Sequence, residues 1–76
     1  MNNINISQAL LEALESKYLG DIAVGRANIE VYLGNAAGIG DHPDIIAVLE
    51  AQVEKVASAT EKLEVVIGFI NERLPE

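Results

Sequence analysis

The chain has 76 residues, of which 50% are hydrophobic and only 4% are aromatic. Its 5 Lys and Arg stand against 12 Asp and Glu, which gives a formal net charge of −7. This balance argues against binding to nucleic acid or to anionic membranes, because too few cations are available to follow a row of phosphates. Cysteine is absent and there is one histidine, so disulfides and thiolate zinc sites are excluded, and we expect no metal or other cofactor.

The N-terminus, Met1 to Asn5, lacks the basic region and apolar run of a signal peptide. No uninterrupted apolar stretch approaches the roughly 20 residues needed to cross a bilayer. We therefore expect a cytoplasmic protein that does not enter a membrane. A chain this short is expected to form one domain, residues 1–76, with a thin margin of stability as a lone monomer.

The first predicted element is a helix over about residues 6–34, capped by Asn5 with Gln8 completing a capping box. Gly20 and Gly25 each cost roughly 1 kcal/mol inside a helix, but the pattern favours one continuous helix over a break at either glycine. Gly25 lies on the apolar stripe, where it would let a partner helix approach closely. The stripe has an eleven-residue rhythm and consists of Leu11, Leu14, Tyr18, Ile22, Gly25, Ile29, Leu33 and Ala36.

A turn is predicted over about residues 35–41, because three glycines fall within residues 34–40. The second helix then starts with Asp41 as its cap and Pro43 in its first turn. The residues that define this turn are Gly38, Gly40, Asp41, His42, Pro43 and Asp44.

Two ligand sites at the turn are conceivable. Glycine amides at a helix start attract anions, but no strand precedes the turn and Asp41 and Asp44 would repel phosphate. These aspartates and His42 could bind a divalent metal, but three residues in one turn do not complete a coordination shell. Capping is therefore the favoured role.

The second helix is predicted over about residues 42–73 and carries a four-heptad seam. Thr60 is the one polar member, and it either sets the register or bonds back to its own helix, the commoner arrangement. The seam consists of Ile46, Leu49, Val53, Val56, Thr60, Leu63, Ile67, Ile70 and Leu74.

Together these elements predict an all-α fold, an antiparallel hairpin of two long helices in which Tyr18 lies near Thr60 and Leu63. Several apolar residues do not fit on the one seam, and four of them should form a patch at the open end of the hairpin: Leu10, Leu14, Val65 and Phe69. An apolar patch on a small protein usually marks an association surface. We therefore expect a homo-oligomer, with a dimer that forms a four-helix bundle as the favoured state.

The turn also carries a resemblance. The run 31–35 leading into the Gly-Ile-Gly-Asp-His-Pro-Asp segment at 38–44, with a weaker match at Glu-Lys-Leu-Glu 61–64, resembles small helical proteins of tailed phages, including marine and cyanobacterial ones. Those proteins carry Pro-Val where Ala36 and Ala37 stand here, and often Glu at the position of Asp41. The resemblance implies a phage accessory protein that acts in the bacterial cytoplasm, and it implies no enzymatic activity.

Three functional hypotheses follow. The leading one is a non-enzymatic helical interaction protein that self-associates and binds a host or phage protein. The second is a small-ligand or anion binder that uses the glycine-rich turn of an oligomer. The third is a purely structural oligomer. No catalytic residues are predicted, because neither Ser7 nor Ser58 has a base nearby in the expected hairpin.

Overall fold

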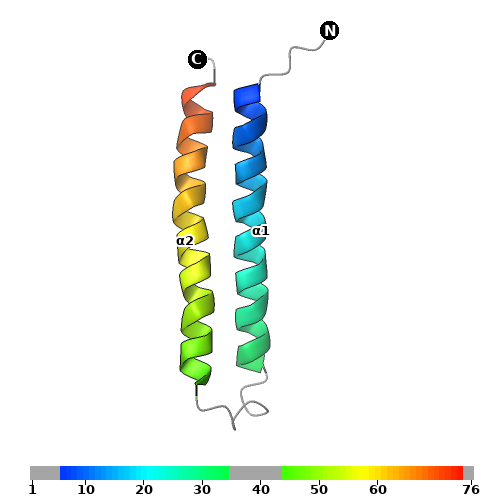
Figure 1. The fold of residues 1–76 in the computed structure, drawn as a ribbon, viewed down its shortest axis with the longest axis vertical. Coiled ribbons are helices and arrows are strands. Elements are labelled where there is room, and N and C mark those ends of the chain that lie inside the picture. Colours follow the sequence, from blue (N-terminus) through cyan, green and yellow to red (C-terminus); the bar gives the residue numbers. More distant parts are fainter. Residues whose placement is uncertain (1–5, 35–43, 75–76) are drawn as a thin grey trace.

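The computed structural model describes residues 6–34 and 44–74. They form two helices, α1 (Ile6–Gly34) and α2 (Ile45–Glu72), which lie side by side and antiparallel (Figure 1). The predicted all-α hairpin is confirmed. At 1.5 Å per residue each helix is about 40 Å long, so the hairpin is long and thin, and most of its side chains reach the surface.

The helix boundaries follow the sequence closely, apart from the start of α2. α1 is one continuous helix through Gly20 and Gly25, as predicted. α2 begins at Ile45, three residues later than expected, and its N-cap is Asp44, whose side chain makes no capping hydrogen bond. The turn predicted at about 35–41 and the cap residues Asn5 and Asp41 lie outside the described residues.

The C-terminus of α2 is closed by Arg73. Its backbone N–H donates to the carbonyl oxygen of Ile70 at 3.0 Å. Its side-chain Nη1 donates to the carbonyl oxygen of Phe69 at 3.1 Å. A cation at this end complements the negative pole of the helix dipole and so stabilises the last turn of α2.

The two helices approach each other closely at Gly25. A Cβ atom placed on this residue would lie 2.6 Å from Cγ2 of Val56 and 3.6 Å from the backbone oxygen of Gln52. One turn further along α1, Nδ2 of Asn28 donates to Oε1 of Gln52 at 3.1 Å. A glycine contact and a polar bond between the helices thus fix their register over the same part of α2.

The buried side of α2 differs from the predicted seam at alternate positions. Leu49, Val56, Leu63 and Ile70 face α1 as predicted, but Val53, Thr60 and Ile67 are exposed. The close contact at Gly25 and the Asn28–Gln52 bond rotate α2 so that the opposite flank is buried. The buried or half-buried heptad consists of Leu49, Gln52, Val56, Ala59, Leu63, Val66 and Ile70.

The buried side of α1 is also a heptad, and the predicted eleven-residue rhythm is wrong. Leu33, predicted on the stripe, is 58% exposed, and the half-buried Tyr32 takes its place. Leu14 is likewise exposed. The buried or half-buried heptad positions are Leu11, Glu15, Tyr18, Ile22, Gly25, Ile29 and Tyr32.

The core of the hairpin is very small. Among the described residues, the only side chains that are almost wholly buried are Ala59, 4% exposed, and Val66, 6% exposed. Neither of the two described helices is apolar over a length sufficient to traverse a membrane.

Candidate functional site

A groove runs along one side of the seam between α1 and α2. Its central part has a volume of about 280 Å³, and the part toward the open end of the hairpin has a volume of about 440 Å³. Tyr18 and Lys62 line both parts, so the two parts adjoin each other, and together we call them the Tyr18 groove. The central part is lined by Tyr18, Asp21, Val24, Lys55, Ser58, Ala59 and Lys62, and the open-end part by Leu11, Leu14, Tyr18, Lys62, Val65, Val66 and Phe69.

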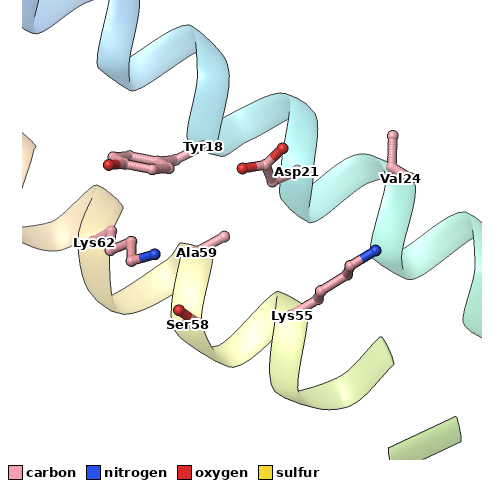
Figure 2. Close-up of a pocket in the computed structure, with 7 residues that line it drawn as sticks. All are labelled: Tyr18, Asp21, Val24, Lys55, Ser58, Ala59 and Lys62. Carbon is pink, nitrogen blue, oxygen red and sulfur yellow. The ribbon is translucent and has the colours of Figure 1, made fainter. Parts of the chain in front are cut away.

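The central part exists because α2 presents small side chains to α1 there. Figure 2 shows Tyr18 and Asp21 of α1 across from Ala59 of α2, with Lys62 and Lys55 extending from α2 on either side of Ala59. The methyl group of Ala59 leaves space that a larger residue would fill. The long lysine side chains border this space without closing it.

The central part carries positive charge in an otherwise acidic protein. Nζ of Lys17 and Oδ2 of Asp21 form an ion pair at 2.8 Å, and the hydrogen bond and charge of Asp21 raise the pKa of Lys17 above its ordinary value. Lys55 and Lys62 have no acidic partner within the described part of the chain. Because Asp21 is paired with Lys17, the groove presents uncompensated ammonium groups.

Tyr18 holds two of the lysines near its ring. Nζ of Lys17 lies 5.5 Å and Nζ of Lys62 lies 5.9 Å from the ring centroid, on opposite helices. Both distances are within the range of cation–π attraction. Tyr18 is therefore the point at which the charged and the apolar parts of the groove meet.

The open-end part contains most of the interaction patch predicted from sequence. The structure brings Leu14, Val65 and Phe69 together as lining residues. Leu10, one turn before Leu14 on α1, does not line the groove and is exposed at 62%. The hairpin thus brings three of the four predicted residues together, and their role in association stays a prediction.

The opposite side of the hairpin has its own apolar surface. A depression there is lined by Arg26, Ile29, Glu30, Val53, Val56 and Ala57. Heptad spacing places Ile46, Thr60 and Ile67 of α2 in line with Val53, and Leu19 and Leu33 of α1 in line with Arg26. We call the surface formed by Ile46, Val53, Thr60, Ile67, Leu19 and Leu33 the Val53 face. All six of these residues are exposed.

The structure describes only one of the candidate residues at the turn. Gly38, Gly40, Asp41, His42 and Pro43 lie outside the described residues. Asp44 is described, and it is exposed. In the described ranges, 6–34 and 44–74, no three His, Cys, Asp or Glu side chains gather closely enough to hold a metal ion.

Sequence reasoning missed the cationic part of the Tyr18 groove, although two signals for it were present. Lys55 and Lys62 are seven residues apart and so lie on the same side of α2. The predicted pairing of Tyr18 with Thr60 and Leu63 already placed Lys62 beside Tyr18. Periodicity along α2 marks both lysines only as positions away from the predicted seam, so it does not show that they converge on Tyr18.

Comparison of the chain with protein-family profiles, with curated proteins and with solved structures found no match.

Proposed function

We propose that the protein is a non-enzymatic helical interaction protein, which self-associates through its exposed apolar surface and in that form binds a protein partner. The phage resemblance at residues 31–45 supports an accessory role of this kind in a bacterial cytoplasm, and it supplies no activity. A purely structural oligomer would share the self-association and lack the partner.

The observation that carries the proposal is the amount of apolar surface that the two helices leave open. Among the described residues, 13 large hydrophobic side chains are exposed, whereas only Ala59 and Val66 are almost wholly buried. A hairpin that buries so little of its apolar surface by itself gains stability if a second chain covers part of that surface.

The composition of the exposed surface supports the same conclusion. Large aliphatic side chains lie open on both sides of the hairpin, among them Ile46 at 73% exposed. Soluble monomers seldom expose such apolar surface contiguously, and larger patches mark association sites.

Thermal unfolding at two protein concentrations tests the proposal. If folding is coupled to dimerisation, raising the concentration from about 1 to about 100 µM adds about 2.7 kcal/mol of stability by mass action. The Tm measured by circular dichroism should then rise by about 5–10 °C. A helical protein with the same Tm at both concentrations would contradict self-association.

A second candidate, a small-ligand binder, is favoured by one specific observation. In the Tyr18 groove, Lys62 lines the apolar open-end part together with Val65 and Phe69, and Lys55 lies further along, in the central part. This arrangement suits an amphiphile with an anionic head and an aliphatic tail, and it places the ligand away from the turn.

Thermal-shift measurements with laurate and with dodecanol test this second candidate. Laurate should raise the Tm, because a ligand that binds the folded state stabilises it, and dodecanol should raise it less. Lys62→Gln should abolish the difference between the two ligands, whereas Arg26→Gln, on the opposite side, should preserve it. Equal shifts with laurate and dodecanol in the unmodified protein would exclude a cationic head-group site.

A further inference from the structure

The Val53 face contains a regular line of side chains that the hairpin does not use. Ile46, Val53, Thr60 and Ile67 follow one another at intervals of seven along α2, and Leu74 lies just beyond the end of the helix. All five are exposed. A heptad line of this kind is one edge of a helix–helix interface, and its partner is absent from the hairpin itself.

This line of side chains is symmetric about Thr60. Thr60 lies midway between Val53 and Ile67, and also midway between Ile46 and Leu74. A second copy of α2 running antiparallel, with a twofold axis beside Thr60, would therefore set Val53 of each chain opposite Ile67 of the other. The same operation sets Ile46 opposite Leu74 and Thr60 opposite its own copy.

From this self-complementarity we infer that the Val53 face is the dimer interface, in which α2 packs antiparallel on α2 of a second copy about a twofold axis at Thr60. This inference rests on the self-association proposed above and names the surface that carries it.

The chemistry at the axis permits burial. Oγ1 of Thr60 donates to the carbonyl oxygen of Val56 in its own helix at 2.7 Å, so the hydroxyl proton already has an acceptor. Packing Thr60 against its copy then leaves no unsatisfied donor. Ala57, one turn away and on the same side, is small enough to let the two α2 helices approach closely.

The Tyr18 groove is the less suitable surface for this pairing. Its apolar part lies at one end of the hairpin, and its centre carries Lys55 and Lys62. A twofold axis at the centre of the groove would bring lysines from the two chains together and remove them from water, which is costly for unpaired charges. Dimerisation through the Val53 face leaves the groove open to a different occupant.

Disulfide trapping tests this interface directly, because the chain has no cysteine of its own. Thr60→Cys should oxidise readily to a covalent dimer, since a twofold axis brings the two copies within disulfide distance. Ser58→Cys, on the side of the Tyr18 groove, is the matched control and should stay a thiol under the same conditions.

A second pair of variants reports the direction of the helices. Val53→Cys and Ile67→Cys, each alone, should not form a disulfide, because the two copies of each residue would lie about 21 Å apart along the helix axis. Mixed together, the two variants should form a heterodimer. Val53→Cys linking to itself would indicate parallel helices and overturn the inference.

Failure of this inference can be told apart from failure of the proposed function. A dimer in solution in which Ser58→Cys is trapped and Thr60→Cys is not would overturn the Val53 face as the interface and leave self-association standing. A folded monomer would overturn both.

Discussion

At the scale of single residues, Gly25 allows the two helices to pack closely, although glycine has a low helix propensity. Glycine weakens a helix, yet this one admits Val56 to a distance that any Cβ atom would block. Gly20, in the same helix, has no atom within 4 Å of the corresponding position. The two glycines therefore make opposite predictions for the same substitution.

Gly25→Ala should destabilise the hairpin by about 1–2 kcal/mol, because the cost of overpacking against stiff Val56 exceeds the gain in helix propensity. Gly20→Ala should stabilise it by about 0.5–1 kcal/mol, because only the propensity changes. Chemical denaturation of both variants at one protein concentration measures the difference. Equal effects of the two substitutions would show that the helices do not meet at Gly25.

At the scale of the helices, the periodicity of the sequence predicted which segments are helical, but it did not predict which side of α2 is buried. The two helices and their antiparallel arrangement could be predicted. Tyr18 was expected near Thr60, but Thr60 is exposed on the Val53 face, and Tyr18 lines the groove on the opposite side with Ala59 and Lys62. The rotation of α2 could not be predicted, because Val53 and Ile67 on one flank are as apolar as Ala59 and Val66 on the other. The decision between the flanks depends on a contact between two helices, at Gly25, and periodicity describes only one helix at a time.

The flank that is buried can be tested with two adjacent valines of α2. Val66 is 6% exposed and Val65 is 60% exposed. Val66→Ala should cost about 2 kcal/mol of unfolding free energy through lost burial and the resulting cavity. Val65→Ala should change it by less than about 0.5 kcal/mol. A reversal of this order in denaturant titrations would mean that α2 is rotated differently from the structure described here.

The candidate sites could be predicted only in part for a related reason. The open-end patch could be predicted because apolar residues that do not fit on the seam must lie on the surface. Leu14, Val65 and Phe69 do meet there. The cationic part of the Tyr18 groove depends on side chains from both helices converging. That convergence requires the register and the rotation together, and a pattern read along one helix contains neither.

At the scale of the whole molecule, the hairpin leaves most of its large apolar side chains exposed and buries few. Two helices provide one seam, and apolar side chains lie on both sides of it. The Val53 face is regular and centred on Thr60, whereas the Tyr18 groove is apolar at one end and cationic at its centre. The two surfaces therefore suit different occupants: a second copy of the chain for the first, and an anionic or acidic partner for the second.

The central claim is that this hairpin is half of an assembly, and the molar mass in solution tests it most directly. Static light scattering on the eluting peak of a sizing column, at low micromolar concentration, should give about 16 kDa, twice the 8.1 kDa of the chain. A folded, helical species of 8.1 kDa under those conditions would contradict the claim.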